Sequence, residues 1–351
     1  MAGFYTGTVV SKGLQAISYT MEKGVFVISL DFEIHWGVSD HHTIESYNEN
    51  LRNVPAIVKR SLQIFREKGI HATWATVGML FCKSKEELFA YVKPENRPDY
   101  TRKEVSNYIV AEQAGNNEQD DPYHYAPSLI KEIIHTPGQE LATHTFSHYY
   151  CLEPGQTPEA FFHDLGAAIA AAKKENIELH TIVFPANQFK KDHLTMCERQ
   201  GIKCYRGNYP SWMYQLKAKA EEGLWKRFCR LLDTYLPVNG SRYVEPVRDG
   251  GLLNIPSSCF LRPYSKKLSF LEGLRVLRIK REMTGAAKRK KIYHLWWHPH
   301  NFGQNMEKNF SILIKVLEHY KKLEQRYNMQ SLTMDEVYNK VIAAEKQGSP
   351  L

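Results

Sequence analysis

The stretch "VFVISLDFEIHWG", Val25 to Gly37, joins an apolar run to two carboxylates. The run predicts a buried strand, and it gives out at Asp31 and Glu33. Since residues two apart on a strand point to the same face, both carboxylates would project together from the end of the strand, where parallel α/β folds place their chemistry. Taken alone, the pair is equally consistent with one acid that caps a turn and one that faces water.

Six further apolar runs bounded by polar residues are predicted as strands. They begin at His71, Glu140, His180, Ile202, Leu252 and Ile292. Segments of helical periodicity separate several of these runs and cover 44–68, 158–175, 190–200 and 306–327. The alternation of strand and helix predicts an α/β protein with a largely parallel sheet, either a barrel or a doubly wound sheet.

The chain length of 351 residues suits one large domain with insertions as well as it suits two domains. We expect an N-terminal extension over 1–22 and a single domain over 23–345. Two polar stretches, at about 94–127 and 208–251, resist the strand and helix pattern. We predict that they are insertions over the rim of the sheet, where they would govern substrate specificity.

Composition narrows the class of protein. An apolar fraction of 43% and a charged fraction of 24% are typical of a globular chain with a sizeable core. The first residues lack the basic and apolar segments of an export signal, and no stretch approaches the roughly 18 apolar residues of a membrane span. The six cysteines show no C-x-x-C spacing, which favours reduced thiols. We therefore expect a cytoplasmic protein.

The net charge of +8 is partly concentrated in the basic stretch 274–291. This segment could dock on an anionic membrane or bind phosphate, possibilities that compete with a helix whose basic face is simply solvated. Nucleic acid is not an expected partner, because no recognised nucleic-acid-binding motif accompanies the charge.

The stretch "THTFSHYY", Thr143 to Tyr150, places His144 and His148 four residues apart, directly after a predicted strand. This spacing suits a metal-ligand pair but is also ordinary for one face of a helix. The strand would deliver both histidines to the rim that carries the two acids. Two imidazoles and a carboxylate are the usual donors for a catalytic divalent metal, and a second carboxylate beside them can act as a base.

The last predicted strand runs into "YHLWWHPHNFG", in which period-two alternation puts His294, Trp296 and His298 on one face. His298 lies where the strand ends, so it could donate a proton to a leaving group while Trp296 forms a wall of the pocket. A buried or hydrogen-bonded structural histidine is the competing interpretation. Spacing leaves His300 open as a second candidate for the acid.

Together these motifs resemble the polysaccharide deacetylase family, the NodB-homology carbohydrate esterases of family four. "HTFSH" fits that family's H-[ST]-x-x-H motif, and "LDFE" is similar to the D-x-[DE] form of its first motif in the branch with allantoinase-like members. The resemblance extends from Val25 to Phe302 in the family's order. It implies a distorted (β/α) barrel of about seven strands, with inserted loops and helices at the rim.

The resemblance also implies roles for particular residues. One divalent metal ion would be held by Glu33, His144 and His148; zinc fits these donors best, and cobalt, manganese, nickel and iron also fit. Asp31 would take a proton from the metal-activated water, and His298 would protonate the departing amine. The two carboxylates could exchange these roles.

One family residue is missing, because Val183 stands where the third motif, R-x-P, carries the arginine that orients the base. Arg206 or Arg262 could replace it. Substrate contacts are expected from the side chains near the rim, namely Trp296, Asn187, Arg262, His300 and Asn301.

The implied reaction removes an N-acyl group, acetyl in the first place, from an amino sugar of a surface polysaccharide or of its nucleotide-linked or lipid-linked precursor. The pattern "HLWWHPHNFG" resembles the branch concerned with surface-polysaccharide synthesis. Alternatives are deformylation of an N-formyl sugar, hydrolysis of another amide as in allantoinase-like relatives, and ester deacetylation. The missing arginine also leaves open a non-catalytic sugar-binding relative.

Overall fold

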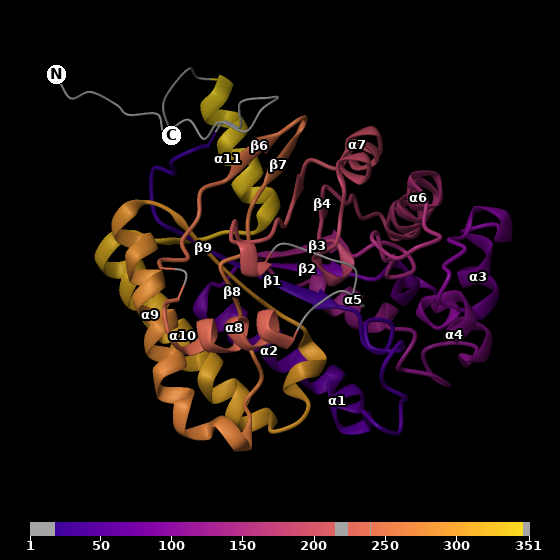
Figure 1. Cartoon of the computed structure of the whole chain (residues 1–351), viewed down its shortest axis with the longest axis horizontal. Coiled ribbons are helices and arrows are strands. Elements are labelled where there is room, and N and C mark those ends of the chain that lie inside the picture. Colours follow the sequence, from indigo (N-terminus) through magenta and orange to yellow (C-terminus); the bar gives the residue numbers. More distant parts are fainter. Residues whose placement is uncertain (1–17, 215–223, 239, 347–351) are drawn as a thin grey trace.

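A computed structural model describes residues 18–214, 224–238 and 240–346 and shows a curled sheet surrounded by helices (Figure 1). The strands pair in the order β6-β7-β5-β4-β3-β2-β1-β9-β8, and β10 pairs with the start of β1. All pairs are parallel except β6 with β7. The strands are β1 Val25–Phe32, β2 Ala72–Thr76, β3 Gln139–Thr143, β4 Thr181–Ile182, β5 Cys204–Tyr205, β6 Val247–Asp249, β7 Leu252–Asn254, β8 Cys259–Phe260, β9 Ile292–Trp297 and β10 Gln330–Ser331.

The sheet curls into an incomplete barrel, which confirms the predicted fold. Val244, just before β6, exchanges two backbone hydrogen bonds of 2.8 Å with Ile292 at the start of β9, so the two sides of the sheet approach each other. All seven predicted strands are present. Three strands were not predicted, β6, β8 and β10, and each has only two or three residues.

Helices cover the outside of the barrel close to the predicted positions. The predicted helix 44–68 is two helices, because Pro55 fits only in the first turn of α2. Outside the barrel, α6 packs against α7 and α9 against α10. The helices are α1 Asn48–Arg52, α2 Val54–Lys68, α3 Lys85–Ala90, α4 Asn107–Gln113, α5 Pro127–Ile134, α6 Pro158–Lys174, α7 Lys191–Arg199, α8 Leu224–Tyr235, α9 Glu272–Arg289, α10 Met306–Tyr327 and α11 Met334–Lys346.

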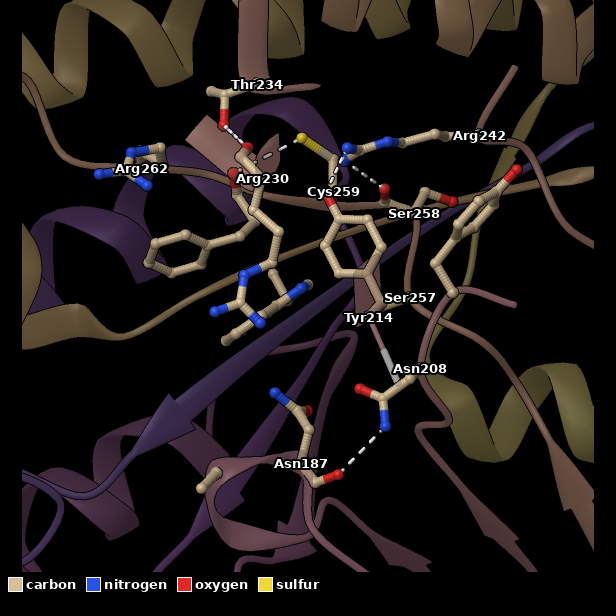
Figure 2. A pocket seen from close by; sticks show the side chains of 14 residues that line it. Asn187, Asn208, Tyr214, Arg230, Thr234, Arg242, Ser257, Ser258, Cys259 and Arg262 are labelled. Atoms are coloured by element: carbon tan, nitrogen blue, oxygen red, sulfur yellow. Dashed lines mark hydrogen bonds between the residues drawn. The ribbon is translucent and has the colours of Figure 1, made fainter. Parts of the chain in front are cut away.

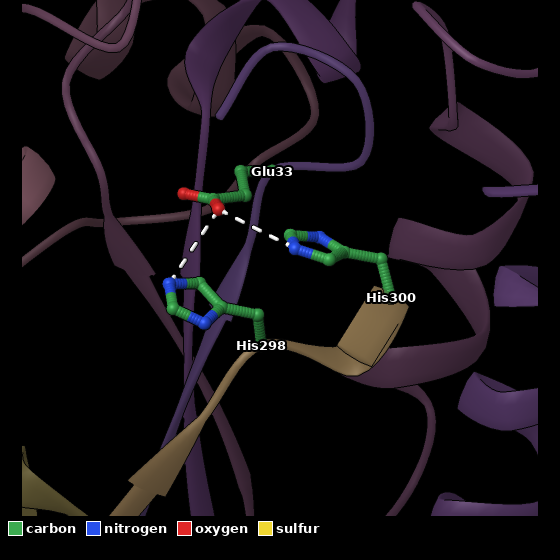
Figure 3. Close-up of side chains that lie close together, drawn as sticks. All are labelled: Glu33, His298 and His300. Carbon is green, nitrogen blue, oxygen red and sulfur yellow. Dashed lines mark ion pairs between the residues drawn. The ribbon is translucent and has the colours of Figure 1, made fainter. Parts of the chain in front are cut away.

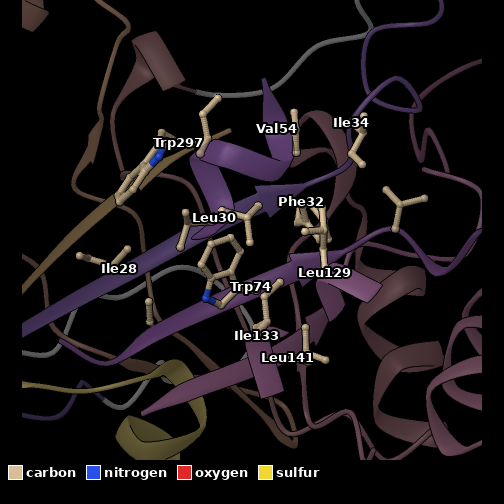
Figure 4. Packing of buried hydrophobic residues seen from close by; sticks show 14 of the residues in the cluster. Ile28, Leu30, Phe32, Ile34, Val54, Trp74, Leu129, Ile133, Leu141 and Trp297 are labelled. Atoms are coloured by element: carbon tan, nitrogen blue, oxygen red, sulfur yellow. The ribbon is translucent and has the colours of Figure 1, made fainter. Parts of the chain in front are cut away.

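The alternation of β1 separates two cores. Ile28, Leu30 and Phe32 face the surrounding helices together with Trp74 of β2 (Figure 4). Burial of each such side chain contributes about 1.5–3 kcal/mol. The opposite face of β1 lines the barrel interior, whose N-terminal half is apolar and includes three residues of α11. This inner core contains Val25, Val27, Ala75, Ala142, Val183, Leu253, Ile255, Ile292, Met334, Val337 and Val341.

The two predicted insertions hold short elements: 94–127 contains α4, and 208–251 contains α8 and β6. Residues 215–223 of the second insertion, and most of the predicted extension 1–22, lie outside the described residues. All six cysteines lie within the described part and are free. None of the helices described in 18–346 has the length and apolar character needed to cross a membrane.

Candidate active site

The inward row of β1 becomes polar towards the C-terminal end of the strand. Ser29, Asp31 and Glu33 follow one another along this row, and all three are buried. Directly afterwards Ile34 has a φ of 49°, uncommon for a β-branched residue, and the chain turns away. Both predicted carboxylates therefore project from the same rim of the barrel.

Glu33 meets the two histidines of the HTFSH motif. Its Oε2 lies 3.2 Å from Nε2 of His144 and 3.1 Å from Nε2 of His148. All three side chains are buried, and their donor atoms lie within 4.8 Å of one another. The predicted metal ligands are thus brought together as one cluster.

The tautomer of His144 follows from its second nitrogen. Nδ1 lies 2.7 Å from the carbonyl of Val183, so it carries the proton and donates it. Nε2 is then left with a lone pair turned towards Glu33, as in most metal-binding histidines. Nδ1 of His148 is buried and has no hydrogen-bond partner among the described residues.

The turn between the two histidines is held by a buried acid of α6. Asp164 accepts hydrogen bonds from the backbone N–H groups of Phe146 and Ser147 and from the Ser147 hydroxyl. Burial raises the pKa of Asp164 to about 6. Within this turn Thr145 and His148 have φ of 63° and 56°, a left-handed conformation that costs energy in a residue other than glycine. The contacts of Asp164 offset this cost and fix the direction of both imidazoles.

Two more histidines approach the other oxygen of Glu33 (Figure 3). Nε2 of His298 lies 3.6 Å from Oε1, and Nε2 of His300 lies 4.0 Å from it. Burial would raise the pKa of Glu33, but the surrounding histidines, His298 first and then His144 and His148, hold it well below its ordinary value. Glu33 is therefore a carboxylate with two imidazoles on each side.

His298 and His300 differ in their surroundings. Nδ1 of His298 accepts a hydrogen bond of 3.0 Å from the Asn301 amide, which leaves the proton of the neutral ring on Nε2. That nitrogen lies 3.6 Å from Oδ2 of Asp31, and the side chain is 23% exposed. His300 is buried, and burial lowers its pKa to about 3, so it is neutral at pH 7. Of these two histidines, His298 has a tautomer fixed by a hydrogen bond and a side chain that is partly exposed at the mouth of the site.

Asp31 is held by Arg206, which directly follows β5. The guanidinium donates two hydrogen bonds to the carboxylate, Nη1 to Oδ1 at 2.7 Å and Nη2 to Oδ2 at 2.8 Å. It also donates to Ser29 at 3.0 Å and to Asn187 at 2.8 Å. Burial would raise the pKa of Asp31, but Arg206 first, and then His144 and His298, bring it below its ordinary value. Asp31 is thus an ionised carboxylate in a buried site.

Arg206 and Arg262 were both considered as replacements for the missing third-motif arginine. The structure places Arg206 against Asp31, so the expectation that Arg262 could take this role is wrong. Arg262 lies instead beside a cavity of about 280 Å³ that adjoins the site (Figure 2). The position of Arg206 carried a signal in the sequence: it immediately follows a predicted strand, which brings it to the same rim as Asp31.

The residues expected to contact substrate fall into two groups. Trp296, Asn187 and Arg262 line the cavity. His300 belongs to the cluster around Glu33, and the side chain of Asn301 is engaged by His298 and by the Tyr47 hydroxyl at 3.1 Å. Asn301 is therefore placed to orient His298.

Comparison with solved structures assigns this arrangement to a known fold. A protein from Mycobacterium smegmatis assigned to the polysaccharide deacetylases matches with a TM-score of 0.58 and 13% identity, over 96% of this chain and 94% of that one. The chain has the polysaccharide deacetylase fold. A Pseudomonas aeruginosa PAO1 protein of the same assignment (TM-score 0.52, 10% identity) and the Puue allantoinase (0.55, 11%) each match over 90% of both chains.

Comparison of the sequence finds no relative: no family model matches the chain, and no curated protein matches it. The resemblance to the deacetylases therefore rests on the fold and on a few residues at the rim of the barrel. In this fold the end of β1 leads to Asp31 and Glu33, the turn after β3 carries His144 and His148, and β9 leads to His298.

Proposed function

We propose that the protein is a metal-dependent hydrolase that removes an N-acyl group, acetyl in the first place, from an amino sugar of a surface polysaccharide or of its nucleotide-linked or lipid-linked precursor. One observation carries this proposal: an ionised Asp31, held by Arg206, lies beside a Glu33 that is flanked by imidazoles on both oxygens. A buried site of this kind supplies a base, a set of metal donors and an acid within one cluster.

The residues fit a divalent metal ion. Glu33, His144 and His148 offer one carboxylate and two imidazole donors, all buried, with donor atoms within 4.8 Å of one another. The proton of His144 on Nδ1 leaves Nε2 available as a ligand. Such a donor set suits zinc and also accepts cobalt, manganese, nickel or iron. When bound, the ion would polarise the amide carbonyl and lower the pKa of water.

Asp31 is the general base of the proposed reaction. Arg206 keeps this carboxylate ionised, and the two-point contact fixes its plane, so it can accept a proton from an attacking water without reorienting. The assignment of Glu33 as ligand rests on its contacts with both histidines of the HTFSH turn, whereas Asp31 contacts an arginine.

His298 is the general acid. The acting form is the imidazolium, which gives its Nε2 proton to the departing amine and is left as a neutral ring. Nε2 is the nitrogen that faces both carboxylates, on the substrate side of the cluster. Trp296 and Phe260 lie at ring-centroid distances of 5.6 and 5.7 Å from His298, and they would restrict the access of bulk water to the proton transfer.

The contact of Arg206 with Asp31 supports the catalytic proposal over the non-catalytic alternative, which was motivated by the missing third-motif arginine. Deformylation, ester deacetylation and allantoinase-like amide hydrolysis use the same set of groups. They remain alternatives for the acyl group and the substrate.

We include in the proposal a cytoplasmic location with peripheral contact between 274–291 and an anionic membrane. Leu274 and Leu277 of α9 are 47% and 44% exposed, and they lie on the same stretch as basic residues. Arg275 and Arg278 are instead buried, paired with Glu272 and Asp233. The proposed contact therefore rests on the outer face of α9 alone.

The experiment that tests this function measures acetate and formate release from N-acetyl and N-formyl amino sugars, in free, nucleotide-linked and lipid-linked form, by the zinc-loaded protein. Wild type should release one acid, and Asp31→Asn should lose nearly all release while it retains the metal. Absence of release from the whole panel by metal-loaded wild type, or undiminished release by Asp31→Asn, would reject the assignment.

A further inference from the structure

The cavity beside the site is positively charged on one side. It has a volume of about 280 Å³ and is lined by Arg230, Arg242 and Arg262, with no Asp or Glu among the described residues that form it (Figure 2). Its volume falls just below the roughly 300–1,000 Å³ of small-molecule sites, so it has room for one unit of a substrate.

The three arginines are not equivalent. Arg242 is buried and pairs with the buried Asp233, and it also donates to the carbonyl of Ser258 at 3.3 Å and to the Tyr214 hydroxyl. Arg278 of α9 pairs with the other oxygen of Asp233 at 3.1 Å. These two guanidiniums balance an internal carboxylate and hold α8 in place.

Arg262 lacks such a partner. Within the described part of the chain its guanidinium has no hydrogen bond and no ion pair, although the side chain is only partly exposed. Burial lowers its pKa, and the neighbouring charges of Arg275 and Arg230 add to this effect. Arg206, the other guanidinium beside Trp296, is already neutralised by Asp31. A half-buried cation among other cations is stabilised when an anion binds beside it.

Two aromatic rings of the cavity wall connect the cavity to His298. Trp296 lies in the cavity wall, stacks under Arg206 at 4.2 Å and has its ring centroid 4.6 Å from that of Phe260. Both rings also contact His298, the proposed acid. An aromatic wall suits the apolar face of a sugar ring, so a sugar on this wall would have its acyl group at His298 and a neighbouring substituent at Arg262.

We propose that the cavity binds the phosphoryl group of a phosphate-linked amino sugar, with Arg262 as its principal contact and Arg230 beside it. This inference rests on the proposed function, which it narrows from any N-acyl amino sugar to one with phosphate attached. A terminal phosphoryl group presents three acceptor oxygens, and each phosphorus of a nucleotide-linked or lipid-linked sugar presents two non-bridging oxygens. Both sources therefore offer at least two acceptors to the Arg262 guanidinium and to the Ser257 hydroxyl that also lines the cavity.

Binding of N-acetylglucosamine 1-phosphate and of N-acetylglucosamine, measured by calorimetry on the zinc-loaded protein, isolates the phosphate. We expect wild type to bind the phosphate ester about tenfold to 100-fold more tightly, Arg262→Gln to lose that preference, and Arg262→Lys to retain part of it. Arg326→Gln, the same change on the exposed surface of α10, should bind both probes as wild type does. Equal affinity of wild type for both probes, or an equal loss for both in Arg262→Gln, would overturn the inference.

Turnover of UDP-N-acetylglucosamine and of a polyprenyl-phosphate-linked N-acetylglucosamine in vesicles then distinguishes the two sources of phosphate. The phosphate source is the substrate for which Arg262→Gln lowers kcat/KM at least tenfold. If kcat/KM falls for neither substrate, the inference is contradicted. Its failure is separable from that of the proposed function. Phosphate binding that depends on Arg262, without any acyl release, would reject the proposed hydrolase and support the phosphate site. Acyl release from the neutral sugar that does not depend on Arg262, without a preference for the phosphate ester, would support the hydrolase and reject the phosphate site.

Discussion

Arg206 and Asp31 form a two-point ion pair in the interior of the barrel, with N–O distances of 2.7 and 2.8 Å and both side chains almost fully buried. The pair joins the ends of β5 and β1, which lie four strands apart in the sheet order. Because the same guanidinium stacks on Trp296 and contacts Asn187, it connects the base to the wall of the adjoining cavity.

Replacement of Arg206 by Gln should lower kcat by at least about 100-fold, since the base would lose its charge partner and its fixed plane. It should also destabilise the protein by about 3–5 kcal/mol, because it leaves a buried carboxylate unpaired. Urea unfolding and turnover of the same preparation measure both effects. Arg206→Lys keeps the positive charge but cannot form the two-point contact, so its kcat and stability should lie between those of wild type and Arg206→Gln. A wild-type kcat in Arg206→Gln would show that Asp31 does not depend on this ion pair.

Gly37 keeps the space next to Glu33 free. A Cβ at this position would lie 1.9 Å from Cδ and 2.1 Å from Oε1 of Glu33. Gly37→Ala should therefore displace the buried carboxylate and weaken zinc binding by about 10–100-fold, the range typical of disturbed ligand orientation. Titration against a zinc indicator measures this. Gly273→Ala, where an added Cβ meets open space, is the matched control, and equal zinc affinity of the two variants would argue against Glu33 as a ligand.

Contact with a membrane through α9 predicts sedimentation with phosphatidylserine vesicles. Leu277→Glu adds a negative charge to the exposed face and should reduce vesicle binding by about tenfold, from the loss of apolar contact and the added repulsion. Ile109→Glu makes the same kind of change at an exposed residue of α4 and should have no effect. Binding that is absent in wild type, or the same in both variants, would exclude α9 as the contact.

His71 and Glu336 provide a pH-dependent link between the start of β2 and α11, with Nδ1 of His71 2.8 Å from the carboxylate. The hydrogen bond to Glu336 raises the pKa of His71, so the stabilisation is complete below the unfolded value of about 6.5 and is lost as pH rises through the folded value. Glu336 stays ionised over this range, because burial raises its pKa but the bond to His71 and other contacts lower it further.

Since both side chains are more than one third exposed, the pair should contribute below about 1 kcal/mol. The free energy of unfolding of wild type should exceed that of Glu336→Gln at pH 6, and the difference should shrink by pH 9. A difference that stays constant or grows with pH would show that His71 is not the titrating partner.

The alternation of apolar runs and helical segments was sufficient to predict a largely parallel sheet, either a barrel or a doubly wound one, and it also placed Asp31 and Glu33 on one face of the first strand. The resemblance of the motifs to a known family supplied the barrel. Strands β8 and β10 lie outside the seven predicted runs. Their positions depend on pairing with β9 and β1, which only the closed sheet supplies.

Spacing also could not decide between alternatives that depend on tertiary contacts. Arg206 and Arg262 both stand near strand ends, and only the curvature of the sheet brings Arg206 to Asp31. The difference between His298 and His300 comes from the amide of Asn301 and from burial, neither of which is visible in a pattern of histidines. The cavity beside Trp296 is likewise formed by segments far apart in the chain.

The most direct test of the account is metal content measured alongside acyl release for wild type, His148→Ala and Asp31→Asn. The account predicts about one divalent ion per chain in wild type, loss of both ion and release in His148→Ala, and an ion without release in Asp31→Asn. His148→Ala protein that is free of metal yet fully active would contradict the claim that the HTFSH turn holds a catalytic ion.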